Sequence, residues 1–193
     1  METLVRYLTH PQVAIDPTIP VPQWGLSALG RRRVTALGAS GWLAGTAEIM
    51  SSGERKAIET AEILATALGL NVVVREAMHE NDRSETGFLA ADEFEAVADA
   101  FFAEPNISVR GWERAIDAQA RIVREMEAVL GRPQLGNALV VGHGAVGTLL
   151  FCHYSKIPIS RAHDQPAGGG NYFTLRRNDR CILHSWRAME IAP

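Results

Sequence analysis

The chain has 193 residues, of which 47% are hydrophobic and 21% are charged, and its formal net charge is −3. This composition is typical of a soluble globular protein, and the length suits a single domain over residues 1–193. No basic run indicates a nucleic-acid partner, no apolar run approaches the ~20 residues of a membrane span, and the N-terminus has no signal-peptide pattern. Cys152 and Cys181 lack disulfide or metal-site spacing, which favours a reducing, cytoplasmic location.

The first part of the chain alternates between short apolar runs and segments with helical spacing. The first run stops at Pro11 and predicts a buried strand that is followed by a titratable side chain, His10. A loop with three prolines follows at 14–25. The strands predicted in this part are 4–8, 47–50 and 71–74, and the predicted helices are 27–37 and 54–68.

Residues 78–91 are polar and irregular, and helices and strands then alternate again. A final hairpin is predicted with Asp179 in its turn. Because strands and helices alternate, the sequence predicts a three-layer α/β/α sandwich with a mostly parallel central sheet. The helices predicted in this part are 92–103, 112–130 and 145–154, and the predicted strands are 137–142, 172–175 and 181–186.

Polar segments follow three strands of the predicted sheet, at 9–10, 51–56 and 142–144. Because the carboxyl ends of parallel strands share one edge of a sheet, we expect these segments to meet there. Two of them open a helix, whose unpaired N–H groups favour anions. The sequence therefore predicts an anion-binding pocket with His10 and His143 facing each other.

Five short motifs, in their order and spacing, resemble those of the histidine phosphatase superfamily, the group that includes phosphoglycerate mutase. The first strand of that family ends in Arg-His-Gly, where this chain has Thr-His-Pro. Its second motif reads Ser-Ser-Pro-Leu-x-Arg-Ala, where this chain has Ser-Ser-Gly-Glu-Arg-Lys-Ala. The others are a Leu-Ser helix start, a glutamate after the third strand and a second histidine after the fourth. The matching segments are 9–11, 26–30, 51–61, 78–80 and 139–143.

The resemblance implies a phosphoglycerate mutase-like fold and a phosphomonoesterase that acts on a small phosphate ester through a phosphohistidine. His10 would be the nucleophile, Glu80 the proton donor, and His143 a group that stabilises the transferring phosphoryl. The Pro11 carbonyl would orient the His10 ring. This mechanism requires no metal ion and no other cofactor. The implied phosphate-binding residues are Thr9, Arg55, Lys56, Arg83 and Gly144.

The chain departs from the family at both phosphate-gripping arginines. Thr9 stands in place of the first and Lys56 in place of the second, with Arg55 one position earlier. A hydroxyl and a flexible ammonium thus replace two rigid guanidinium groups. Losing one such donor costs about 3–4 kcal/mol in the transition state, so a weak phosphatase is expected unless Arg31 or Arg83 compensates.

Two interpretations therefore remain open at the level of sequence. The first is the phosphatase, and the second is a degenerate family member that binds a phosphorylated or anionic ligand without turnover. The number of cations in the pocket distinguishes them. Individual residues also have plainer roles: Glu80 as a solvated loop carboxylate and His143 as the start of a helix. The sequence leaves the substrate open, and a homodimer is one option for the assembly.

Overall fold

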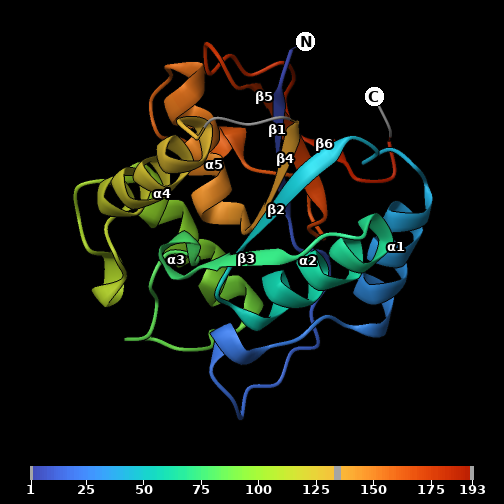
Figure 1. Cartoon of the computed structure of the whole chain (residues 1–193). Coiled ribbons are helices and arrows are strands. Elements are labelled where there is room, and N and C mark those ends of the chain that lie inside the picture. The colour runs from blue at the N-terminus through green and yellow to red at the C-terminus, as the bar shows by residue number, and fades with distance from the viewer. Residues whose placement is uncertain (1, 133–135, 192–193) are drawn as a thin grey trace.

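A computed structural model, which describes residues 2–132 and 136–191, has one six-stranded sheet between two layers of helices (Figure 1). The strand order is β3-β2-β4-β1-β5-β6. The pairs β3–β2, β2–β4 and β4–β1 are parallel, and β5 and β6 continue the sheet antiparallel. The strands are β1 (Leu4–Thr9), β2 (Thr46–Ser52), β3 (Val72–Arg75), β4 (Asn137–Gly142), β5 (Asn171–Arg176) and β6 (Arg187–Ala188).

The helix ends follow the capping residues of the sequence. The Ser27 side chain accepts a hydrogen bond from the Gly30 N–H and caps α1, and Gly69 ends α2 with a left-handed φ of 68°. The α-helices are α1 (Ala28–Ala39), α2 (Arg55–Leu68), α3 (Ala91–Ala103), α4 (Ala115–Leu130) and α5 (Gly144–Ser155). Short 3₁₀ turns lie at η1 (Val21–Gln23), η2 (Glu76–Met78), η3 (Val109–Gly111) and η4 (Arg161–His163).

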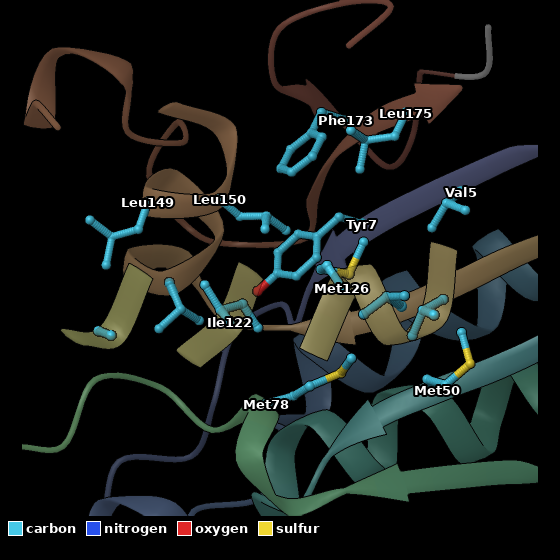
Figure 2. Packing of buried hydrophobic residues seen from close by; sticks show 14 of the residues in the cluster. Val5, Tyr7, Met50, Met78, Ile122, Met126, Leu149, Leu150, Phe173 and Leu175 are labelled. Atoms are coloured by element: carbon cyan, nitrogen blue, oxygen red, sulfur yellow. The ribbon is translucent and has the colours of Figure 1, made fainter. Parts of the chain in front are cut away.

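Each face of the sheet has its own hydrophobic core. On one face α3, α4 and α5 cover β1, β4 and β5, and Tyr7 lies among side chains such as Met126 and Leu150 (Figure 2). On the other face α1 and α2 pack on Leu8 and Leu139. The alternating strand pattern thus gives a three-layer α/β/α sandwich, and the predicted fold class is confirmed.

The predicted last strand, 181–186, is wrong. Only one isolated bridge, Leu175 to Ile182, forms there, and β5 pairs instead with the two residues of β6. The chain leaves the sheet before Trp186, whose ring packs on Phe173 and whose N–H donates to the His163 carbonyl. The long predicted helix at 112–130 also begins later, at Ala115.

The sheet brings together the three polar segments that the sequence predicts to meet. β1, β4 and β2 are parallel neighbours, with Thr9 beside Gly142 and Ser51 beside Val141 in register. The His10 N–H continues the ladder with a 3.0 Å hydrogen bond to the Gly142 carbonyl. The residues after these strands therefore share one edge of the sheet. Over the described ranges, no helix has the length and apolar character needed to cross a membrane.

Candidate active site

Two histidine rings face each other at the carboxyl ends of β1 and β4. The ring centroids of His10 and His143 are 5.2 Å apart, and the ring planes meet at 69°. His10 is partly exposed and His143 is fully buried. The His10 Nδ1 lies 2.9 Å from the Pro11 carbonyl, which can only accept, so Nδ1 carries the proton and Nε2 keeps its lone pair. The Pro11 carbonyl thus orients the His10 ring and leaves Nε2 with the lone pair that a nucleophile would need.

His143 is held at both backbone and ring. The Tyr7 hydroxyl accepts from the His143 N–H at 3.0 Å and donates to the His143 carbonyl at 3.1 Å. The ring Nε2 lies 2.7 Å from the Ser52 hydroxyl. The ring Nδ1 is buried and has no hydrogen-bond partner among the described residues. A buried polar atom without a partner is uncommon and indicates a group that is satisfied by something other than the chain.

Two glycines make room for the Tyr7 side chain. A Cβ at Gly142 would overlap the Tyr7 hydroxyl, and a Cβ at Gly147 would lie 2.6 Å from the ring atom Cε1. Gly142 precedes His143, and Gly147 lies one turn into α5. The glycines therefore let an aromatic side chain from β1 reach the backbone at the start of α5.

Both histidines are neutral at pH 7. Burial is the main cause that lowers the pKa of His10 to about 4, and the nearby Lys56 ammonium lowers it further. Burial also holds the pKa of His143 well below its ordinary value, against the attraction of the Glu54 carboxylate. A neutral imidazole has the lone pair that attack on phosphorus needs, so the pKa shift suits His10 as a nucleophile.

The Glu80 carboxylate caps the helix that begins after His143. It accepts from the Ala145 N–H at 3.1 Å and the Val146 N–H at 2.9 Å. The anion-attracting N-terminus of α5 is therefore occupied by a side chain of the protein itself. Burial raises the pKa of Glu80, and the Arg83 guanidinium and the helix N–H groups oppose that rise without cancelling it. A carboxyl with a raised pKa is a suitable proton donor.

Lys56 forms a buried ion pair with Glu54. The Lys56 Nζ contacts a Glu54 oxygen and donates to the Val21 carbonyl at 3.1 Å. The other Glu54 oxygen accepts from the Glu80 N–H at 2.8 Å and lies 3.6 Å from His143 Nε2. Burial alone would raise the pKa of Glu54, but His143 and Lys56 beside it keep that pKa below its usual range. An ionised carboxylate thus lies next to the ammonium in this site.

The other phosphate-binding candidates occupy different positions. Arg55 is 60% exposed and pairs with Glu59, outside the site. Arg83 stacks over the Phe94 and Trp112 rings, at 5.0 and 5.6 Å. Arg31, which the sequence offers as a substitute, also pairs with Glu59.

Thr9 and Gly144 meet a residue that the sequence reading left out. The buried Thr9 hydroxyl donates to Gln165 Oε1 at 2.6 Å. The Gln165 Nε2 lies so close to the Gly144 backbone that a Cβ there would be 2.5 Å from it. Gln165 therefore lies between the end of β1 and the start of α5.

A cavity of about 800 Å³ is lined by Glu54 and Glu80, the carboxylates that lie beside His143 and the start of α5. Arg83, His79 and residues of the 3₁₀ turn η2 also form part of its wall. A smaller hollow of about 350 Å³ shares Arg83 with it and is lined by Trp24 and other aromatic side chains. Across residues 2–132 and 136–191, no group of three or more histidine, cysteine, aspartate or glutamate side chains is placed to hold a metal ion.

Three residues of this site were missed by sequence reasoning: Tyr7, Glu54 and Gln165. Tyr7 reads as one more apolar residue of a buried strand, and its polar hydroxyl was the available signal. Glu54 stands where the family has an apolar residue, which marked it as a change of chemistry. Gln165 lies in a loop without periodic pattern, and no local signal connects it with Thr9.

The sequence model of the histidine phosphatase superfamily (branch 1) matches residues 20–186. The chain belongs to this superfamily, as its motifs predict. The matched region begins after the strand that carries Thr9 and His10, the motif in which the chain departs from the family. No match was found among curated proteins.

Several solved structures share the fold over nearly the whole chain. Mycobacterial glucosyl-3-phosphoglycerate phosphatase, in complex with inorganic phosphate, is 20% identical with a TM-score of 0.77 and covers 98% of this chain and 99% of its own. YhfR of Bacillus stearothermophilus is 21% identical with a TM-score of 0.79, covering 95% of each chain. Phosphoserine phosphatase of Entamoeba histolytica, with 3-phosphoglyceric acid, is 14% identical with a TM-score of 0.77, covering 96% and 97%. Two of these three neighbours are named as phosphatases.

Proposed function

We propose that the chain is a phosphomonoesterase that transfers the phosphoryl group of a small ester to His10 and then to water. The observation that carries this proposal is the pair of neutral rings at one sheet edge. His10 Nε2 has a lone pair, and His143 lies 5.2 Å away, centroid to centroid, with a buried Nδ1 that lacks a partner among the described residues. We propose a phosphoryl oxygen as the partner of this atom.

The proposed reaction has two steps. The His10 Nε2 lone pair forms a bond to phosphorus while the ester P–O bond breaks, and the leaving alkoxide takes a proton from Glu80. Glu80 then removes a proton from water, whose oxygen attacks the phosphohistidine and releases inorganic phosphate and free His10. The net reaction is ester plus water to alcohol plus phosphate. The raised pKa of Glu80 is what its role as proton donor needs.

A second function, ligand binding without turnover, stays open because one specific observation lowers the expected turnover. The buried Glu54 carboxylate neutralises Lys56, which stands in the place of a family arginine. The pocket therefore offers a phosphate dianion less positive charge than two arginines would. We infer a phosphatase of low turnover, in which this carboxylate weakens the binding of phosphate.

The names of the structural neighbours support a small phosphorylated substrate. Two of them are named as phosphatases of glucosyl-3-phosphoglycerate and of phosphoserine, and the second is seen in complex with 3-phosphoglyceric acid or, as a mutant, with phosphoserine. We propose a small phosphate ester for this chain as well. A cytoplasmic location, the absence of a nucleic-acid partner and a homodimeric assembly stay predictions from the sequence.

The test is hydrolysis of 4-nitrophenyl phosphate by the wild type, His10→Ala and His153→Ala, with acid–base trapping of the phosphoryl adduct. His153 is an exposed histidine near the end of α5 and serves as the matched control. We expect an acid-labile, base-stable adduct in the wild type and the control, and none in His10→Ala. Equal rates in the wild type and His10→Ala would contradict the phosphatase and leave the binding function.

A further inference from the structure

The Gln165 side chain is held at its oxygen and free at its nitrogen. Its Oε1 accepts from the Thr9 hydroxyl at 2.6 Å and from Asn171 Nδ2 at 3.1 Å. The Thr9 oxygen accepts from the Asn171 N–H at 3.0 Å, and its one proton has two acceptors, Gln165 Oε1 at 2.6 Å and the Asn171 carbonyl at 3.2 Å, of which Gln165 is the nearer. Among the residues that the structure describes, no acceptor is bound to Gln165 Nε2. Two N–H donors of the carboxamide are thus left unused at the sheet edge.

The orientation of this carboxamide follows from a chain of fixed donors and acceptors. The Pro166 carbonyl can only accept, so the Asn171 atom 2.9 Å from it is the nitrogen, Nδ2. Because that nitrogen can only donate, the Gln165 atom that it also contacts is the oxygen. The Gln165 nitrogen must therefore face the opposite way, toward Gly144.

The free nitrogen lies where the two strand ends meet. Thr9, which holds the carboxamide, immediately precedes His10, and Gly144, which the nitrogen overlies, immediately follows His143. Gly144 also has no side chain to exclude it: a Cβ there would come within 2.5 Å of Nε2. The unused donors thus lie beside the two residues that flank the histidine pair.

We propose that Gln165 binds the transferring phosphoryl group through Nε2, as a replacement for the guanidinium that Thr9 no longer supplies. Thr9 and Asn171 are positioning residues, because they contact the carboxamide oxygen and turn its nitrogen toward the phosphoryl site. The donor is neutral, so it stabilises charge on a phosphoryl oxygen less than an arginine does. This inference rests on the proposed phosphatase function and assigns one further binding residue to the same site.

The test compares Gln165→Met, which keeps the length of the side chain and removes its polar atoms, with Gln23→Met at an exposed glutamine of η1. Two quantities are measured: the dissociation constant of orthovanadate, and kcat/KM for 4-nitrophenyl phosphate. We expect Gln165→Met to weaken orthovanadate binding at least tenfold and to lower kcat/KM about 100-fold, the usual effect of removing one such donor. Gln23→Met should match the wild type in both.

The positioning role has its own pair of variants. Thr9→Val removes the hydroxyl at constant shape and should weaken orthovanadate binding about tenfold. Thr9→Ser keeps a hydroxyl and should bind orthovanadate within about threefold of the wild type. Gln165→Glu keeps the oxygen that Thr9 bonds and replaces the donors by an anion, so it should bind orthovanadate no better than Gln165→Met. This variant decides the question if Gln165→Met fails to fold.

The outcomes separate this inference from the proposed function. Orthovanadate binding needs no turnover. The role of Gln165 is overturned if Gln165→Met and Gln165→Glu bind orthovanadate as tightly as the wild type, or if the wild type does not bind it. If His10→Ala is inactive while the Gln165 variants keep wild-type rate and affinity, the phosphatase stands and the inference fails. If His10→Ala is as active as the wild type but Gln165→Met loses orthovanadate, the phosphohistidine fails and the anion-binding role of Gln165 remains.

Discussion

The Tyr7 hydroxyl bridges the backbone N–H and carbonyl of His143, with hydrogen bonds of 3.0 and 3.1 Å. Tyr7 comes from the middle of β1 and is fully buried, and His143 is the residue at which β4 passes into α5. One side chain of the first strand thus sets the position of the second histidine. The hydroxyl is neutral, because burial raises the pKa of Tyr7 far above its ordinary value.

Removing this hydroxyl should destabilise the protein and disturb the site together. Tyr7→Phe leaves the buried His143 N–H without a partner, at about 1–3 kcal/mol, whereas the His143 carbonyl keeps its 3.1 Å bond from the Gly147 N–H. We expect a loss of about 1–3 kcal/mol in the free energy of unfolding and a fall in kcat/KM. Denaturant unfolding and steady-state kinetics measure both. Tyr154→Phe loses a hydrogen bond to Glu127 outside the site and should keep kcat/KM. Equal losses of kcat/KM in the two variants would argue against a role of the Tyr7 hydroxyl in positioning His143.

Lys56 and Arg55 should differ sharply although they are adjacent in sequence. The Lys56 ammonium is buried at the site, and the Arg55 guanidinium is 60% exposed and pairs with Glu59. Lys56→Gln should lower kcat/KM about 100-fold, whereas Arg55→Gln should stay within about twofold, because exposed ion pairs contribute little. Kinetics with 4-nitrophenyl phosphate decide between them. A larger effect at Arg55 would show that the lysine is not the phosphate ligand.

Glu54→Gln should strengthen phosphate binding. The ionised carboxylate contacts Lys56 and lies 3.6 Å from His143 Nε2, so it competes with an anion for the same groups. Neutralising it should lower the dissociation constant of inorganic phosphate at least tenfold, while stability without phosphate falls because a buried ammonium loses its partner. Calorimetric titration measures the first effect. Glu62→Gln, at an exposed position of α2, is the charge-matched control. Unchanged phosphate affinity in Glu54→Gln would show that the Glu54 carboxylate does not compete with phosphate.

The role of Glu80 as proton donor predicts a dependence on the leaving group. Glu80→Gln should lower turnover of an alkyl phosphate about 100-fold or more, because the alkoxide then has no proton source. Turnover of 4-nitrophenyl phosphate, whose leaving group needs little protonation, should fall much less. Binding of inorganic phosphate should change little. Kinetics with the two substrates provide the measurement, and equal losses with both would mean that Glu80 acts only as the cap of α5.

The acid limb of the pH–rate profile should lie unusually low for a histidine nucleophile. His10 needs its lone pair, so activity is lost as pH falls through its pKa, which burial and Lys56 lower to about 4. Activity should therefore persist between pH 5 and 6.5, where an ordinary histidine would be largely protonated. At the other end, activity should fall when Glu80 loses its proton, above the usual range of a glutamate. A profile of kcat/KM against pH checks both limbs; an acid limb near 6.5 would show that His10 is not desolvated.

The sequence predicts the sheet and its polar edge because these depend on local patterns. Apolar runs and helical spacing place β1, β2 and β4, and parallel order then forces His10 and His143 to the same end. Residue-level placement at a helix start is harder. Arg55 and Lys56 both lie in the first turn of α2, and a rotation of about 100° per residue turns one toward the site and the other toward solvent.

Contacts between distant segments account for what the sequence did not predict. Thr9 and Gln165 are 156 positions apart, and Gln165 lies in a loop without periodic pattern, so no spacing rule connects them. The sequence offered cations such as Arg31 and Arg83 as substitutes for the missing arginine. In the structure Arg31 pairs with Glu59. Arg83 stacks on aromatic rings at the cavity wall and is close enough to lower the pKa of Glu80. The uncharged carboxamide of Gln165 is the group bonded to Thr9.

The space that Gly142 and Gly147 leave for Tyr7 has a consequence for how this protein diverges from others. Tyr7, Gly142 and Gly147 pack against one another, so none of the three is free to change alone. They do so although Tyr7 and His143 are 136 positions apart in the sequence. A relative with a side chain at position 147 must shrink or move the residue at position 7, and its second histidine then loses its anchor. Tyrosine at 7 together with glycine at 142 and 147 is therefore a signature by which chains built on this arrangement can be told apart from sequence alone.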